Sequence, residues 1–171
     1  MHFLAAALAT LALGAGSASE ANVAPCEKAI IGHGPADWRS ESTVAGPVGV
    51  RRDPLQDMSL HRGWYTTKLP LLVEGRAPET VTVSVPPRLR HRVFLIYGEV
   101  RDRDGNPGLS FSNTRGYGET EFQPCANKPR TIWPGGIKIK GDGPVYLLVA
   151  TAGEDPVRLP LGRPQAYEPA S

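Results

Sequence analysis

The chain has 171 residues and carries 19 Lys and Arg against 17 Asp and Glu, a net charge of +2. Its basic residues are scattered among acidic ones. This argues against a nucleic-acid partner, because nucleic-acid-binding proteins concentrate Lys and Arg with stacking aromatics on one face. No segment after the N-terminus approaches the about 20 apolar residues of a transmembrane helix. No cofactor motif occurs, so we expect no cofactor. The 19 Gly and 17 Pro punctuate short apolar runs, which is typical of an all-β domain.

The N-terminal segment has the features of a secretory signal peptide. An apolar run covers residues 3–15, and Gly16 and Ala18 are the small residues that signal peptidase requires for cleavage after Ala18. The run is too short to cross a bilayer as a stable helix. We therefore expect residues 1–18 to be a signal peptide, residues 19–165 a single secreted β-sandwich domain, and residues 166–171 a flexible tail.

Cys26 and Cys125 are the two cysteines of the chain. In a protein delivered to an oxidising compartment they are expected to pair, and the bridge would close a loop of about 100 residues. The alternative is a lipid anchor on Cys26, because Val23 and Ala24 precede it as in a lipid-attachment box, although Pro25 does not fit that pattern. No histidine lies beside either cysteine in the sequence, which argues against a catalytic thiol.

The first elements of the expected domain are an edge strand and a short helix. Residues 43–50 predict the edge strand, because Pro47 cannot donate a hydrogen bond to a central ladder. Residues 53–63 carry helix signals: an aspartate as N-cap, a proline at the first helical position and a glycine just past the end. In this helix Leu55 and Met58 would face the sheet.

Three further strands follow in the middle of the chain. Residues 65–74 are extended and are interrupted by Pro70. Residues 79–85 alternate Val with Thr or Ser, which predicts a strand with one buried and one solvated face. Residues 92–100 are apolar on both faces and predict the central, most buried strand.

The remaining strands are expected at residues 118–124, 136–140, 145–151 and 157–162. In the second of these, Ile137 and Ile139 alternate with Lys138 and Lys140. Short strands separated by turn residues imply two packed antiparallel sheets, an immunoglobulin-like or related β-sandwich with at most one short helix.

The segment PCANKPRTIWPGG, residues 124–136, predicts a corner at which the chain crosses between the sheets. Pro134 and Gly135 fit a type II turn, in which the glycine adopts a positive φ. Trp133 would close the open end of the core, a packing role that is more common for tryptophan than ligand binding.

This corner, together with ADWRSESTVAGPVG, LPLLVEGRAPETVTVSVPP and RVFLIYGEV, resembles a group of small exported proteins of actinobacteria that share the PC…KPRT…WPGG pattern. The resemblance covers most of the mature chain. It implies export, a β-sandwich and a paired second cysteine, and it implies no catalytic residues.

Motifs for catalysis and metal binding are incomplete. RDRDGNPG, residues 101–108, begins like a calcium loop but lacks the required Gly and Glu, so it predicts a polar hairpin loop. The histidines have no zinc-ligand spacing. His33, near Asp37, is a candidate general base without a nucleophile motif. We therefore predict no catalytic and no metal-binding residues.

The densest basic run is PPRLRHR, with Arg88, Arg90 and Arg92, and Arg130 adds to its field as a candidate anion-binding residue. The sequence favours a secreted structural or protein-interaction module whose partner is an envelope or extracellular protein. The alternatives are a binder of an anionic cell-wall polymer or glycan, and a hydrolase that uses His33 or a carboxylate pair.

Overall fold

The protein is built almost entirely of β-strands. A computed structural model describes residues 22–30, 38–75, 79–98, 114 and 116–168. The strands are β1 (Asn22–Ala24), β2 (Ser42–Ala45), β3 (Val48–Arg51), β4 (Ser59–His61), β5 (Trp64–Lys68), β6 (Leu71–Glu74), β7 (Val81–Ser84), β8 (Val93–Ile96), β9 (Glu119–Phe122), β10 (Arg130–Trp133), β11 (Gly136–Lys140), β12 (Val145–Thr151) and β13 (Val157–Gly162). Two short 3₁₀ turns, η1 (Cys26–Lys28) and η2 (Pro87–Leu89), accompany them. Within these residues no helix has the length and apolar character needed to cross a membrane.

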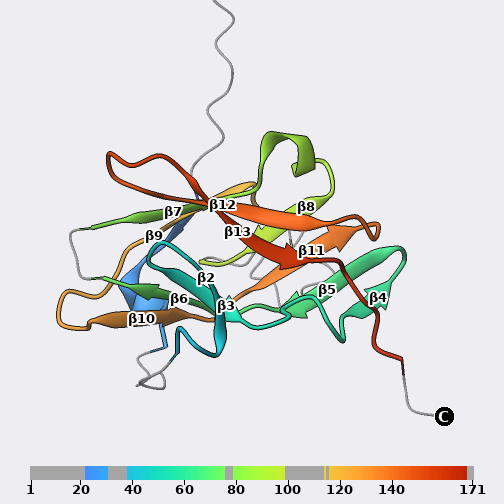
Figure 1. Ribbon diagram of the computed structural model, residues 1–171, viewed down its shortest axis with the longest axis horizontal. Helices are drawn as coiled ribbons and strands as arrows, with labels where there is room; N and C mark the ends of the chain where they lie inside the picture. The colour runs from blue at the N-terminus through green and yellow to red at the C-terminus, as the bar shows by residue number, and fades with distance from the viewer. Residues whose placement is uncertain (1–21, 31–37, 76–78, 99–113, 115, 169–171) are drawn as a thin grey trace, which may run out of the picture.

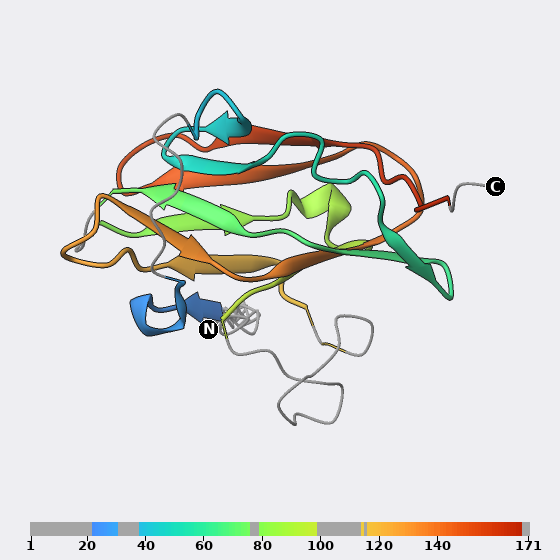
Figure 2. The ribbon, with the colours of Figure 1, turned by 90° about the horizontal axis from the view of Figure 1, so that it is seen from below.

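The strands form two layers, as Figures 1 and 2 show. One layer is a five-stranded sheet in the order β1-β9-β7-β12-β13, in which only β1 pairs in parallel. The other consists of two four-stranded antiparallel sheets, β10-β6-β3-β2 and β4-β5-β11-β8. The chain passes directly from β5 to β6 and from β10 to β11, which join these two sheets end to end (Figure 2). The expected all-β sandwich of packed antiparallel sheets is confirmed.

A hydrophobic cluster of described residues from both layers fills the space between them. In β7 and the residue after it, Val81, Val83 and Val85 are buried, whereas Thr82 and Ser84 are half-exposed. The alternation predicted for residues 79–85 is therefore confirmed. It has this form because successive side chains of a strand point to opposite faces.

The junction between the two small sheets is held by Gly135. The amide of Leu69 donates a hydrogen bond to the Gly135 carbonyl at 2.9 Å, which carries the pairing across the gap between the strands. A Cβ at position 135 would lie 2.1 Å from Cδ1 of Tyr97, so no larger residue fits without movement of that ring. The predicted crossing between sheets is confirmed, but the type II turn is wrong. Gly135 has no positive φ, and strand β10 occupies part of the predicted corner.

Two strand predictions are wrong in their placement. The predicted edge strand at residues 43–50 is a hairpin, in which Gly46 takes a φ of 54° between β2 and β3, and only β2 is at the edge. The strand predicted at residues 92–100 is buried as expected, but β8 lies at the edge of its sheet. On the side of β8 away from β11, Leu95 forms an isolated antiparallel bridge with Tyr117. Residues 99 and 100 lie outside the described residues.

The predicted helix at residues 53–63 is wrong. Asp53 and Asp57 have φ angles of 49° and 54°, which a right-handed helix does not allow, and β4 begins at Ser59. Leu55 and Met58 are buried as expected. The helix signals are overridden because the C-terminal segment supplies the hydrogen bonds that a helix would make internally.

The C-terminal segment lies along the Leu55–Met58 loop. The Gln165 amide donates to the Leu55 carbonyl, and the Met58 amide donates to the Gln165 carbonyl, both at 2.9 Å. Ala166 pairs with Met58, and the Tyr167 amide donates to the Met58 carbonyl at 3.0 Å. Two residues of the predicted tail thus pair with the domain.

Candidate functional site

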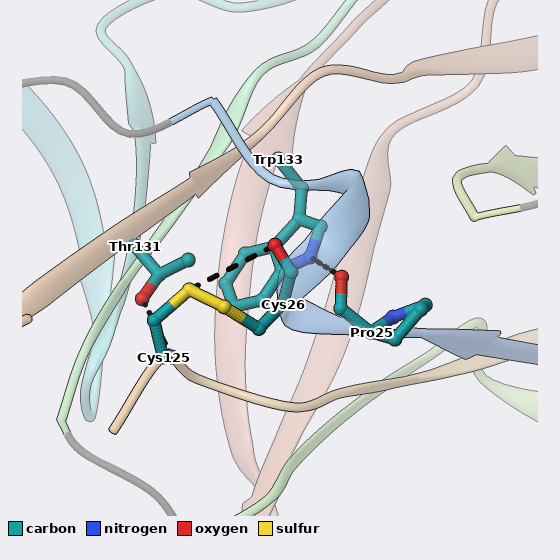
Figure 3. Close-up of a disulfide and its surroundings, with 5 residues drawn as sticks. All are labelled: Pro25, Cys26, Cys125, Thr131 and Trp133. Carbon is teal, nitrogen blue, oxygen red and sulfur yellow. Dashed lines mark hydrogen bonds between the residues drawn. A yellow bond between two sulfur atoms is a disulfide. The ribbon is translucent and has the colours of Figure 1, made fainter. Parts of the chain in front are cut away.

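Cys26 and Cys125 form a disulfide with their Cα atoms 5.1 Å apart, as predicted (Figure 3). The Cys125 amide donates to Thr131 Oγ1 at 3.1 Å, and Trp133 Nε1 donates to the Pro25 carbonyl at 3.1 Å. These contacts tie the segment after β1 to β9 of one layer and to β10 of the other. A sulfur engaged in this bond cannot carry a lipid, which argues against the lipid-anchor alternative at Cys26.

Trp133 belongs to the core at this end of the molecule. It is 1% exposed and stacks edge-on against Phe122, whose ring in turn packs edge-on against Tyr97, with centroid distances of 5.2 and 5.1 Å. The Tyr97 hydroxyl donates to the Leu69 carbonyl. Burial raises the pKa of Tyr97 far above its ordinary value. The packing role predicted for Trp133 is confirmed. Because its ring is buried, Trp133 offers no exposed surface on which a ligand could stack.

Two arginines of the predicted basic run bind backbone carbonyls. Arg90 Nε donates to the Val85 carbonyl at 3.1 Å. Arg92 donates to the carbonyls of Lys140 and Pro144 at 3.2 and 3.1 Å. Both guanidinium groups therefore brace the loops at the start of β8 and the end of β11, and fewer of their N–H groups remain for a ligand.

The other two predicted arginines lie far from each other. Arg88 is exposed on η2, and its guanidinium lies 5.1 Å from the centroid of the Tyr146 ring. Arg130 is on β10 opposite Glu74 of β6, in the other layer from β7, the strand that η2 follows. The structure does not bring the four predicted arginines into one site.

A different basic surface lies on the outer side of the sheet β4-β5-β11-β8. Ile137 and Ile139 of β11 are fully buried in the core. Lys138 and Lys140, which alternate with them, therefore belong to the opposite side, and Lys140 is exposed. Lys140 pairs in register with Trp64 of β5, and Lys138 pairs with Phe94 of β8. We call this surface the basic aromatic face; it consists of His61, Trp64, Lys68, Phe94, Lys138 and Lys140.

The half-buried indole of Trp64 is at the centre of the basic aromatic face. The ammonium nitrogens of Lys138 and Lys140 lie 4.9 and 5.9 Å from its centroid, within range of cation–π attraction. The half-buried Phe94 ring is 5.8 Å from it, centroid to centroid. Lys138 is only 6% exposed, whereas Lys140 faces solvent.

The strands that form the basic aromatic face carry basic residues but no acidic ones. The four strands read SLH, WYTTK, GIKIK and VFLI, and they contain no Asp or Glu. By contrast, Glu119 and Glu121 lie on β9 of the other layer, where they alternate with the buried Thr120 and Phe122. No carboxylate on these four strands offsets the positive charge of the exposed Lys68 and Lys140.

Sequence reasoning missed most of this surface. The alternation of Ile137 and Ile139 with lysines places Lys138 and Lys140 on the side opposite the buried isoleucines, where Lys140 is exposed and Lys138 is 6% exposed. Trp64 gave no signal, because its neighbours across the sheet come from a strand far along the chain. The signal that could have found it is a run of strands that carry lysines and aromatics but no acid.

A groove of about 350 Å³ lies at the end of the sandwich opposite β4 and β5 (Figure 1). Its lining includes the acidic residues Glu74, Glu79 and Glu154. Glu74 pairs with Arg39, and Glu154 accepts a hydrogen bond from the Thr151 hydroxyl. Across the described ranges, no three His, Cys, Asp or Glu side chains are grouped so as to hold a metal ion. His33, Asp37 and the loop of residues 101–108 lie outside the described residues.

No protein-family model matches the sequence, and no curated protein or solved structure shows significant similarity to it.

Proposed function

We propose that the protein is exported and binds an acidic polysaccharide through its basic aromatic face. The observation that carries this proposal is the half-buried Trp64 ring, flanked by Phe94 and by two lysine ammonium groups at 4.9 and 5.9 Å, in a sheet whose strands contain no carboxylate.

The chemistry of these side chains suits an acidic sugar. The flat, apolar face of an indole packs against the C–H face of a pyranose ring, while an ammonium group pairs with a carboxylate or phosphate on the same unit. Exposed ion pairs contribute only about 0.2–1 kcal/mol each and are screened by salt. The interaction is therefore expected to need several sugar units and to weaken as ionic strength rises.

Export is proposed on separate grounds. Disulfides persist in oxidising compartments, and Cys26 is paired with Cys125. The apolar segment at residues 3–15 and the resemblance to small exported actinobacterial proteins point in the same direction. A role as a protein-interaction module remains a prediction. We favour the polysaccharide because the charge and the aromatic rings of one face match its chemistry.

Retention on immobilised polygalacturonate tests the proposal. Trp64→Ala and Lys140→Ala are each expected to raise the dissociation constant about 5- to 10-fold, because each removes about 1 kcal/mol of stacking or charge pairing. The controls are Ile30→Ala and Lys28→Ala, which remove an exposed apolar side chain and an exposed lysine close to the disulfide and outside the basic aromatic face. Both controls should bind like the wild type.

Three results would contradict the proposal. If Lys28→Ala weakened retention as much as Lys140→Ala, the attraction would be due to net charge rather than to this face. If a neutral polysaccharide were retained equally at high salt, the lysines would have no role. If a single-stranded DNA of equal charge bound as tightly, the ligand class would be wrong, since stacking and cations also bind nucleic acid.

A further inference from the structure

A second cluster of cations and an aromatic ring lies on the outer side of the five-stranded sheet. In β12, the side chains of Val145, Leu147 and Val149 are buried, and the half-exposed Tyr146 alternates with them on the outer side. The guanidinium of Arg158, from β13, lies 3.9 Å from the centroid of the Tyr146 ring, and that of Arg88, from η2, lies 5.1 Å from it.

The two guanidinium groups lie close to one ring, and neither has a carboxylate partner among the described residues. Arg88 and Arg158 are both exposed. Glu119 and Glu121 lie on β9, two strands away from β12, which is about 10 Å at ordinary strand spacing. Two like charges close to one ring raise the local positive potential, which favours the binding of an anion.

Stacking also leaves the binding atoms of the arginines accessible. A guanidinium that lies over an aromatic ring uses its flat face, whereas its N–H donors point outward in its own plane. Those donors match the two oxygens of a carboxylate or phosphate in a bidentate arrangement. The Tyr146 ring thus orders two long side chains whose edges remain available to an anion, which reduces the entropy that a ligand must otherwise overcome.

We propose that Arg88 and Arg158, positioned by Tyr146, form a second site, which binds a single oxyanion, a phosphate or a carboxylate. The site is independent of the basic aromatic face, since none of its residues lies on β4, β5, β8 or β11. It would give the protein anion contacts on both layers of the sandwich.

An NMR titration of the arginine Nε–Hε groups with inorganic phosphate, at constant ionic strength, tests this site alone. The signals of Arg88 and Arg158 are expected to shift with saturation below about 50 mM phosphate, as for a weak single-ion site. Arg158→Lys keeps the charge but loses the fork of donors, so it should weaken phosphate binding at least about 5-fold. Arg163→Lys, at an exposed arginine in another place, should leave it unchanged.

A parallel titration with acetate separates the two sources of the oxyanion. A saturable shift with either anion supports the site. The anion with the lower dissociation constant is then the preferred ligand. Shifts that rise linearly with both anions, or that are equal in Arg158→Lys and the wild type, would overturn it. Retained phosphate binding in Arg158→Lys with a lowered thermal midpoint would show that Arg158 only packs on Tyr146, and would also overturn it.

Discussion

Tyr97 links the aromatic core to the junction of the two small sheets. Its ring contacts the position where a Cβ of residue 135 would stand, and its hydroxyl donates to the carbonyl of Leu69, the residue whose amide bonds to Gly135. Because Tyr97 is fully buried, an ionised phenolate there would lose its hydration, and the pKa is raised above the ordinary value of 10.

This burial predicts a pH dependence of stability. A folded-state pKa above the unfolded value means that Tyr97 contributes its full stabilisation below pH 10 and loses it as the pH rises further, because only the unfolded chain releases the proton. Above the unfolded-state pKa and below the folded-state pKa, the free energy of unfolding falls by about 1.4 kcal/mol per pH unit. We expect Tyr97→Phe to cost about 1 kcal/mol at pH 7, from the lost hydrogen bond.

Urea unfolding of the wild type and Tyr97→Phe between pH 7 and pH 11 measures both effects. The two free energies of unfolding should converge above pH 10, since the Phe variant lacks this titration while all other tyrosines are shared. Parallel curves over the whole range would show that the phenol of Tyr97 can ionise in the folded protein.

At the scale of elements, the disulfide attaches the shortest strand of the five-stranded sheet. β1 has three residues and, among the described strands, pairs only with β9, so few hydrogen bonds hold it. The side-chain amide of Asn22 adds bonds to the Tyr97 carbonyl at 3.0 Å and to Thr120 Oγ1 at 2.9 Å. The bond between Cys26 and Cys125 keeps this strand next to its partner.

Reduction is therefore expected to destabilise the whole fold. The bridge spans a sequence separation of 99 residues, and the chain-entropy model assigns about 4.7 kcal/mol to a loop of that size. Urea unfolding with and without reductant should show a loss approaching that value. Cys26→Ser combined with Cys125→Ser should match the reduced protein and should not respond to reductant. A wild type whose unfolding is insensitive to reductant would contradict the pairing.

The elements also show where sequence reasoning succeeds and where it fails. The Val81–Val85 alternation and the Ile137–Lys140 alternation are local patterns, and both predicted the buried face correctly. The signals at residues 53–63 are local too, but there the C-terminal residues Gln165 and Ala166 pair with Leu55 and Met58. A partner more than a hundred residues away is invisible to a local pattern, so the helix prediction failed.

At the scale of the whole molecule, the described part of the sandwich carries a basic surface and an acidic groove in different places. The sheet β4-β5-β11-β8 has lysines and aromatic rings without acid, and the groove at the opposite end is lined by Glu74, Glu79 and Glu154. Sequence reasoning predicted a sandwich and the cysteine pair, but not this separation. The basic aromatic face depends on the register that pairs Trp64 with Lys140, and register is set by the folded sheet rather than by either strand alone.

The most direct test of the proposed function is a map of backbone amide shifts on addition of a galacturonate hexasaccharide to the ¹⁵N-labelled protein. Binding at the basic aromatic face predicts that the largest shifts fall on β5, β8 and β11 around Trp64, Phe94 and Lys140, and that added salt diminishes them. Shifts centred on another surface, or no shifts at millimolar ligand, would contradict the proposal.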